Sequence, residues 1–357
     1  MQVAGGDASI AAMNYTKLEA KEASKAQIHG LWAAITTPFT PDGDLDEAGL
    51  RHNMRHFTNV LHIDGIFCTG NMGEFWALTK EERRRAVEIV VEEARGKCRV
   101  IAHTAHHSAR ETVDLTLHAQ NVGADFVIFI NPYLPAMSED GVFDWFEYIS
   151  KRVDIGIWMF DSSYAGYGLS PELTARIGGL TNVCGVKVGR PLEHYAEVHR
   201  LTQGSIVLSH PSEGLWLRLM RDYGQQVHNS SATPFAFQTA TSQPLREYTE
   251  LGLAGKFEQA ERRSADMDPI RQLWHKWQSQ PWDERRIVPI AYLKYWCELL
   301  GMAGGPVREP LQQLTDAERA EIRADLERVG LLGGATPSPV ATGEGRGEGA
   351  TLSASVR

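Results

Sequence analysis

Residues 182–189 read Asn-Val-Cys-Gly-Val-Lys-Val-Gly, a short β-branched run with one lysine near its end. This pattern is typical of a buried strand that delivers a single amine, from Lys187, at its carboxyl end. Burial removes hydration from an ammonium, so it lowers the pKa of a lysine from about 10.4 and favours the neutral amine that attacks carbonyl groups. The alternative is a lysine whose stem lies along apolar surface while its head reaches water. On this stretch alone, both interpretations of Lys187 stay open.

The composition is that of a protein with a large core. Hydrophobic residues make up 43% of the 357 residues, and the formal net charge of −9 argues against a nucleic-acid-binding surface. No apolar run approaches the roughly 20 residues that span a bilayer, and the N-terminus lacks a signal-peptide pattern. The four cysteines form no C-x-x-C pair, so we expect reduced thiols and no zinc site. We therefore expect a soluble, cytoplasmic protein that binds neither nucleic acid nor membrane.

The two ends of the chain differ in composition from its middle. Residues 1–28 are small, polar and charged, and we predict an N-terminal arm with a short helix over Leu18–Lys25. Residues 333–357 are Gly, Ala, Ser, Thr and Pro with almost no large apolar side chains, which predicts a disordered tail. Two further regions lie between these ends, residues 29–240 and residues 241–332.

Strand-like runs alternate with helix-length amphipathic segments over residues 29–240. The expected strands are Leu31–Thr36, Gly65–Thr69, Arg99–His103, Phe126–Ile130, Ile155–Phe160, Val183–Lys187, Ile206–His210 and Gln226–Asn229. The expected helices are Glu47–Leu61, Lys80–Arg95, Arg110–Val122, Gly141–Lys151, Pro171–Gly178, Glu193–Leu201 and Glu213–Tyr223. Eight strand–helix units of about 20–35 residues predict an α/β protein, a (β/α)8 TIM barrel. The alternative is a doubly wound open sheet, but no G-x-G-x-x-G follows the first strand.

Residues 241–332 are rich in helix formers and predict a C-terminal helical extension, with one helix over Asp316–Arg328. The same region holds several tryptophans. We expect these to fill helix contacts rather than to bind sugar: Trp274, Trp277, Trp282 and Trp296.

In a TIM barrel the chemistry lies at the carboxyl ends of the strands. Mostly polar residues stand at the eight expected strand ends: Thr36 and Thr37, Gly70 to Glu74, His103 and Thr104, Asn131 to Tyr133, Phe160 and Asp161, Lys187, His210, and Asn229 with Ser230. Because these groups come from distant strands and meet on one face, their pattern favours a functional Lys187.

This ordered set resembles the dihydrodipicolinate synthase / N-acetylneuraminate lyase family of pyruvate-dependent class I aldolases, from about Gly30 to Leu332. The resemblance rests on four motifs: Ala34-Ile35-Thr36-Thr37-Pro38-Phe39, Gly70-Asn71-Met72-Gly73-Glu74 at the family's G-[ST]-T-G-E loop, Asn131-Pro132-Tyr133, and Gly185-Val186-Lys187. A G-x-x-G-E loop alone is weak evidence, whereas the ordered set at barrel spacing is strong evidence.

The resemblance implies that Lys187 forms an imine with pyruvate or another 2-oxo acid, whose C3 then loses a proton or breaks a C–C bond. The resemblance implies a homodimer or homotetramer. It implies neither a metal nor a cofactor besides the imine. The backbone N–H groups of Asn71 and Met72 are expected to hold the substrate carboxylate, in a tight loop suited to Gly70 and Gly73. Further candidates for substrate binding are Thr36, Thr37, Phe160, Asn229 and Ser230. Glu74 either orients this loop from beneath or caps the following helix.

The sequence departs from the family's proton relay. The family's strand-end tyrosine aligns with Phe160, the loop threonine with Asn71, and the second of two paired tyrosines with Leu134, although Tyr133 remains. No arginine lies in Asp161–Gly168, where the family places one for a second carboxylate. We therefore expect the chain not to be dihydrodipicolinate synthase itself.

Other groups are candidates to replace the relay. His103 and His210 stand at strand ends, and histidine performs acid–base chemistry near neutral pH. Tyr133, Tyr164 and Asp161 are the remaining candidate proton carriers. For His106 and His107 we favour structural roles, and a metal site built from these histidines is an alternative that the family does not need.

The main hypothesis is a Schiff-base-forming lyase of the class I aldolase type, which makes or breaks a C–C bond next to the iminium of a 2-oxo acid. The altered relay leaves open an imine-dependent dehydratase, hydratase-aldolase or decarboxylase. A catalytically silent homologue that binds a small ligand is the third hypothesis. The phenylalanine at position 160 supports it, and Lys187 argues against it.

Overall fold

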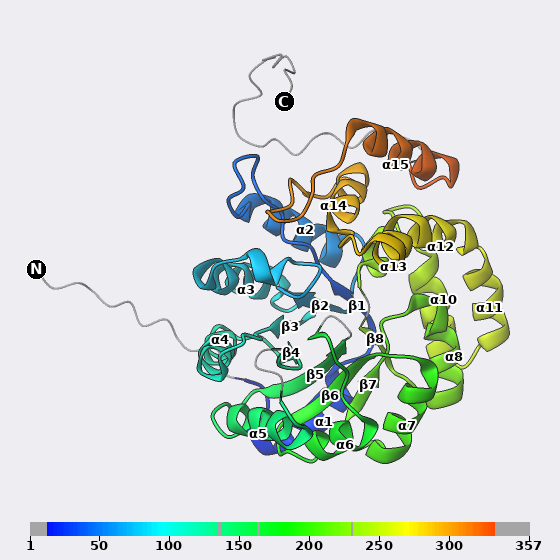
Figure 1. The fold of residues 1–357 in the computed structure, drawn as a ribbon. Helices are drawn as coiled ribbons and strands as arrows, with labels where there is room; N and C mark the ends of the chain where they lie inside the picture. The colour runs from blue at the N-terminus through cyan, green and yellow to red at the C-terminus, as the bar shows by residue number, and fades with distance from the viewer. Residues whose placement is uncertain (1–12, 134–136, 163–164, 230, 333–357) are drawn as a thin grey trace, which may run out of the picture.

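The structure, a computed structural model, describes residues 13–133, 137–162, 165–229 and 231–332 (Figure 1). Its centre is a sheet of eight parallel strands in the order β7-β6-β5-β4-β3-β2-β1-β8. The strands are β1 (Gly30–Ala34), β2 (Gly65–Cys68), β3 (Arg99–His103), β4 (Phe126–Ile130), β5 (Gly156–Ser162), β6 (Val183–Gly189), β7 (Val207–Ser209) and β8 (Val227–Asn229). The predicted TIM barrel is confirmed, and β5 and β6 run two residues further than expected.

A serine completes the barrel between β7 and β8. Ser209 Oγ donates to the carbonyl of Val227 at 3.2 Å and accepts from the backbone N–H of Asn229 at 2.9 Å. On its other side β8 pairs with β1 in a regular parallel ladder. The hydroxyl of Ser209 thus supplies hydrogen bonds where β7 and β8 meet.

Helices follow the strands as the periodicity predicts. They are α2 (Glu47–Asn59), α3 (Lys80–Ala94), α4 (Ala109–Val122), α5 (Glu139–Ser150), α6 (Pro171–Gly178), α7 (Leu192–Thr202), α8 (Glu213–Tyr223) and the short α9 (Thr233–Ala236). The start of α3 is a capping box, in which Thr79 Oγ1 accepts from the N–H of Glu82 and the Glu82 carboxylate accepts from the N–H of Thr79.

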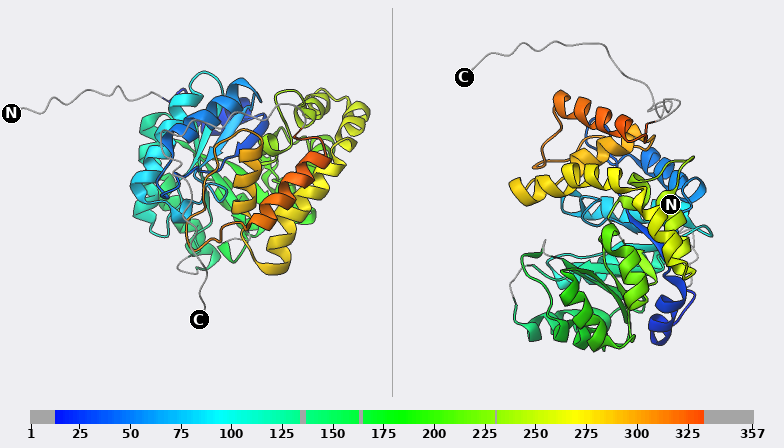
Figure 2. Two further views of the ribbon diagram at one scale, coloured as in Figure 1. Left: turned by 90° about the horizontal axis from the view of Figure 1, so that it is seen from above. Right: turned by 90° about the vertical axis from the view of Figure 1, so that its right-hand side faces the viewer.

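The C-terminal helices gather at one side of the barrel (Figures 1 and 2). They are α10 (Pro244–Leu253), α11 (Phe257–Ala265), α12 (Asp268–Trp274), a π-helix (His275–Ser279), α13 (Gln280–Arg285), α14 (Ile290–Leu299) and α15 (Asp316–Arg328). Side chains of α2 anchor the segment after α14: Asn53 Nδ2 donates to the carbonyl of Ala303 at 2.8 Å. Among the described helices, none has the length and apolar character needed to cross a membrane.

The barrel interior contains tryptophans that face glycines on the neighbouring strands. Trp32 of β1 pairs in register with Gly65, and Trp158 of β5 with Gly185. A Cβ at Gly65 would lie 2.1 Å from the Trp32 ring, and one at Gly185 would lie 2.2 Å from the Trp158 ring. Only glycine fits at these two positions. The result is a solid floor, and Lys187 stands two residues above it on β6.

The N-terminal residues cover the opposite end of the barrel. The helix α1 (Ala20–Gln27), preceded by a 3-10 turn (Lys17–Glu19), packs against β6 and begins two residues later than expected. Ser24 Oγ accepts from Trp158 Nε1 at 3.2 Å, and Lys21 Nζ donates to the carbonyl of Gly178. This end carries no part of the cavity described next.

Candidate active site

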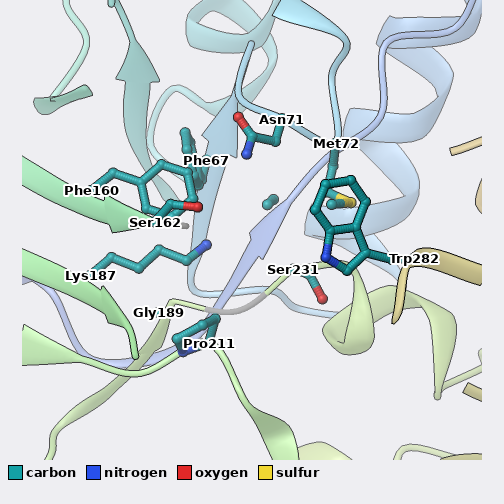
Figure 3. Close-up of a pocket in the computed structure, with 11 residues that line it drawn as sticks. Phe67, Asn71, Met72, Phe160, Ser162, Lys187, Gly189, Pro211, Ser231 and Trp282 are labelled. Atoms are coloured by element: carbon teal, nitrogen blue, oxygen red, sulfur yellow. The ribbon is translucent and has the colours of Figure 1, made fainter. Parts of the chain in front are cut away.

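A cavity of about 230 Å³ lies at the carboxyl ends of the strands (Figure 3). Its described lining is Ala34, Phe67, Asn71, Met72, Phe160, Ser162, Lys187, Gly189, Pro211, Ser231 and Trp282. Four of these residues were predicted for the site from the sequence: Asn71, Met72, Phe160 and Lys187. They come from β5, β6 and the loop that follows β2, so the fold brings together residues that are distant in the chain.

Lys187 points its amine into this cavity and is only 3% exposed. The amine lies 4.9 Å from the ring centre of Phe67 and 4.9 Å from that of Phe160, and these two rings meet edge to face. The strand register explains the contact, because Phe160 is the direct β5 partner of Lys187. Burial lowers the pKa of Lys187 from 10.5 to about 7. The lysine is therefore buried, and the alternative of a head that reaches water does not hold.

The loop Gly70–Glu74 is a tight turn next to the amine. The N–H of Gly73 donates to the carbonyl of Gly70 at 3.1 Å, and the N–H of Glu74 donates to that of Asn71 at 3.1 Å. Thr37 Oγ1 donates to the carbonyl of Gly73 at 2.8 Å and joins the loop to the segment that follows β1. Within the described part of the chain, the backbone N–H groups of Asn71 and Met72 donate no hydrogen bond. Two donors at the cavity are thus available to an anion.

Glu74 lies beneath this loop and is fully buried. Its Oε1 is 2.6 Å from Nζ of the equally buried Lys294 of α14, and its Oε2 accepts from the N–H of Arg308 at 3.1 Å. It makes no capping hydrogen bond to the turn that follows. Of the two predicted alternatives, orientation of the loop from beneath is therefore the correct one.

The two strand-end histidines are buried away from the cavity lining. His103 packs edge to face on Phe75 at 4.5 Å, and burial holds its pKa well below the usual range. His210 accepts from the N–H of Ser212 at Nδ1, 3.1 Å, and its Nε2 lies 2.9 Å from the carbonyl of Arg190. Because both ring nitrogens of His210 bind the backbone, the ring is held as a neutral structural group. Among the described residues, no cluster of three potential metal ligands occurs.

Asp161 faces the outside of the barrel. Its Oδ1 accepts from the N–H of Leu169 at 3.0 Å, and its Oδ2 lies 3.4 Å from Nε2 of His194. Side chains alternate along a strand, and since Phe160 and Ser162 line the cavity, Asp161 lies on the other face of β5. Burial raises the pKa of Asp161. From the sequence we expect the strand to end at Phe160 with Asp161 beside it at the site, whereas β5 continues to Ser162.

The remaining predicted residues surround the cavity or fall outside the described chain. Thr36 is buried two residues after β1, Asn229 is buried at the end of β8, and Tyr133 is half-buried outside the described lining. Within the described residues, neither polar atom of the Asn229 side chain has a hydrogen-bond partner. Tyr164 and Ser230 lie outside the described residues.

Several lining residues were missed by the sequence analysis. Ser162 and Gly189 stand two positions beyond Phe160 and Lys187, so strict alternation along longer strands could have found them. Trp282 had no such signal. The expectation of helix packing holds for the other C-terminal tryptophans, since Trp277 and Trp296 are buried and Trp274 packs on Trp296, whereas Trp282 lines the cavity.

The sequence model of the dihydrodipicolinate synthetase family matches residues 27–329. The chain belongs to this family. It is 30% identical over 312 residues to the 4-hydroxy-tetrahydrodipicolinate synthase of Methanothrix thermoacetophila, covering 85% of this chain and 98% of that protein. It is 29% identical over 310 residues to the protein of that name from Methanopyrus kandleri, covering 86% and 98%.

Solved structures of the family share the fold. The dihydrodipicolinate synthase of Aquifex aeolicus superimposes with a TM-score of 0.74 at 24% identity, covering 85% of this chain and 98% of that one. The enzyme of Acinetobacter baumannii, complexed with pyruvate, gives 0.73 at 21% identity, covering 85% and 99%. Enzymes of the dihydrodipicolinate synthetase family are lyases that form an imine between a lysine and pyruvate without an external cofactor.

Proposed function

We propose that this protein is a lyase of the class I aldolase type in which Lys187 forms an imine with pyruvate or another 2-oxo acid. The observation that carries the proposal is a buried amine with a pKa of about 7, pointing into a cavity at the mouth of the barrel. At neutral pH roughly half of such amines are unprotonated, whereas an ordinary lysine is almost entirely charged. Only the neutral amine is a nucleophile.

The reaction follows from this amine. Lys187 Nζ attacks C2 of the 2-oxo acid, the C2 oxygen leaves as water, and a protonated imine remains. This imine withdraws electrons from C3, which loses a proton and becomes an enamine carbon. The enamine attacks the carbonyl carbon of a second substrate and forms a C–C bond. Water then releases the 4-hydroxy-2-oxo acid and restores the amine, and the reverse sequence breaks the same bond.

The loop Gly70–Glu74 is proposed to hold the substrate carboxylate. The N–H groups of Asn71 and Met72 are the donors, and a pair of backbone N–H groups in a turn forms a concavity suited to an anion. Thr37 and Glu74 act on this loop as positioning residues, through the hydrogen bond to Gly73 and the ion pair with Lys294.

Proton transfer must differ from that of the family's tyrosine relay. Phe160 places a ring without a hydroxyl beside the amine. The polar side chains in the described lining besides Lys187 are Asn71, Ser162 and Ser231. We propose that protons move through Ser162 or Ser231 with water, and Tyr133 and Tyr164 stay candidates. For this reason we propose a reaction other than that of the 4-hydroxy-tetrahydrodipicolinate synthases to which the chain is similar.

The replaced relay also supports a second candidate function, an imine-dependent dehydratase, hydratase-aldolase or decarboxylase of a 2-oxo acid. These reactions share the imine but move their protons at other steps. Product identification from a panel of 2-oxo acids separates them: loss of water, loss of CO2, or addition of water before cleavage would favour the second candidate, whereas aldol cleavage alone would count against it. The family's typical assembly supports a homodimer or homotetramer here, which sedimentation would measure.

Borohydride trapping tests the proposal. Incubation with pyruvate and borohydride should add one reduced pyruvate to the protein, and peptide mass spectrometry should place it on Lys187. Lys294 is an internal control and should carry no adduct. It is also buried and its pKa is also lowered, to about 8, but its amine is bound to Glu74. Lys187→Ala should abolish the adduct. An adduct that persists in Lys187→Ala, or none with any 2-oxo acid, would refute the proposed function.

A further inference from the structure

The cavity wall opposite Lys187 contains two apolar side chains, Trp282 from the C-terminal helices and Met72 from the loop after β2. In Figure 3 the indole of Trp282 faces the lysine across the cavity, with Met72 next to it. We propose, resting on the function above, that the second substrate is an aldehyde carrying a flat, uncharged aromatic ring that binds against Trp282. The sequence motifs of the barrel do not contain this residue, which lies on α13.

The position of Trp282 is set by a π-helix and its contacts. The π-helix His275–Ser279 joins α12 to α13 without a break in the helical chain. A π-helical turn holds an extra residue, so it rotates every later side chain about the helix axis, and such turns are frequent at functional sites. This turn is fixed to α15, because Trp277 Nε1 donates to Asp325 Oδ2 at 2.9 Å and Lys276 Nζ lies 2.7 Å from the same oxygen. Tertiary contacts thus direct Trp282 to the cavity.

The charges around the cavity argue for a neutral second substrate. Lys187 is the one cation in the described lining, and the proposed reaction uses its amine. Arg190 lies against Gly168, where a Cβ would meet its guanidinium at 2.6 Å, and Arg286 is exposed, 5.6 Å from the Trp282 ring centre. A second carboxylate deep in the cavity would lose its hydration without an ion pair in return. A neutral ring has little hydration to lose.

The size of the cavity agrees with one ring. A dry cavity of about 150 Å³ is known to hold benzene. The volume here, about 230 Å³, therefore accommodates one six-membered ring together with the three-carbon imine. Benzaldehyde is the smallest probe that tests this class of substrate.

The test compares three aldehydes of similar size in condensation with pyruvate. Cyclohexanecarbaldehyde removes the flat ring, and 4-carboxybenzaldehyde adds a charge. We expect kcat/KM for benzaldehyde to exceed that of either probe about tenfold. Trp282→Ala should lower kcat/KM for benzaldehyde about tenfold, and Trp282→Phe should retain most of it. The matched control is Trp76→Ala, because Trp76 is 42% exposed and lies outside the described lining. This variant should leave kcat/KM for benzaldehyde and the preference for benzaldehyde over the two other aldehydes unchanged.

Trapping with pyruvate on each variant separates this inference from the proposed function. If pyruvate is trapped normally but the enzyme does not prefer benzaldehyde, the aromatic substrate is wrong and the imine chemistry stands. The same conclusion follows if Trp282→Ala leaves kcat/KM for benzaldehyde unchanged. If the wild type forms no imine, binding of the unreactive ring of benzyl alcohol, followed by saturation-transfer NMR, tests the site directly. A signal that Trp282→Ala abolishes supports the aromatic site, whereas an unchanged or absent signal overturns it.

Discussion

Two buried lysines in this protein differ in what their amines meet. Lys294 binds the Glu74 carboxylate at 2.6 Å and the carbonyl of Pro306 at 2.8 Å, which stabilises its charged form. Lys187 meets the rings of Phe67 and Phe160. A cation gains about 0.5–2 kcal/mol from an aromatic face, which is less than the lost hydration that lowers the pKa of Lys187 to about 7. The pKa of Lys187, about 7, is lower than that of Lys294, about 8, so a larger fraction of the Lys187 amine is neutral at pH 7.

The pKa of Lys187 predicts how imine formation depends on pH. The trapping rate with pyruvate should rise about tenfold between pH 6 and pH 8 and then level off, because the neutral fraction rises through a pKa of about 7. Stopped-flow or quenched trapping across this range measures it. A rate that keeps rising to pH 10 would show an ordinary lysine and would contradict the burial argument.

The same pKa governs stability. Between about pH 7 and pH 10 the unfolded chain holds a proton on this lysine that the folded chain has lost, so the free energy of unfolding should rise with pH across this window. Lys187→Met should remove that rise and should be more stable than the wild type at pH 7. Denaturant unfolding at pH 7 and pH 9.5 provides the comparison.

At the scale of elements, the loop Gly70–Glu74 depends on contacts with the C-terminal region. Glu74 is joined to Lys294 of α14 and to the backbone of Arg308, and both Lys294 and Arg308 also pack over the ring of Phe39. The loop that we propose to bind substrate is thus held by residues more than two hundred positions further along the chain. These contacts act together with the hydrogen bond from Thr37 to Gly73.

Lys294→Met is expected to lower the free energy of unfolding by about 3–5 kcal/mol, because it leaves the Glu74 charge buried without its partner. The KM for pyruvate should rise several-fold as the loop loses its anchor, with a smaller change in kcat. Denaturant unfolding and steady-state kinetics measure both. The double variant Glu74→Gln with Lys294→Met removes the unpaired charge and should recover most of the stability. If Lys294→Met alone is as stable as the wild type, the ion pair between Glu74 and Lys294 does not hold the loop.

In the whole molecule, the cavity that contains Lys187 and the N-terminal cover lie at opposite ends of the barrel. Tyr15 belongs to the N-terminal cover: its hydroxyl donates to the carbonyl of Asp125 at 2.6 Å and accepts from the N–H of Gly156 at 2.9 Å. Its ring stacks on Phe126 at 5.3 Å. These contacts join the start of the chain to β4 and β5 below the tryptophan floor.

Tyr15→Phe keeps the stacked ring but leaves two backbone groups without a partner, so we expect a loss of about 1–3 kcal/mol in the free energy of unfolding. The rate of imine formation per folded molecule should stay the same, because the packed floor separates this end from the cavity. Unfolding curves and trapping rates on the same samples test both statements. A slower trapping rate at full folding would show that the two ends are coupled.

The sequence by itself determined the barrel, the strand that carries Lys187 and the loop Gly70–Glu74, because alternation, helix periodicity and turn glycines are local patterns. The prediction from sequence placed Asp161 at the site because it ended β5 at Phe160. The strand continues to Ser162, and alternation along it turns the Asp161 carboxylate outward. Only the tertiary structure decided that His210 is bound by backbone at both ring nitrogens, that Ser209 joins β7 to β8, and that Trp282 faces Lys187. These features depend on packing between segments that are distant in the chain, and no local pattern records which distant surface a side chain will meet.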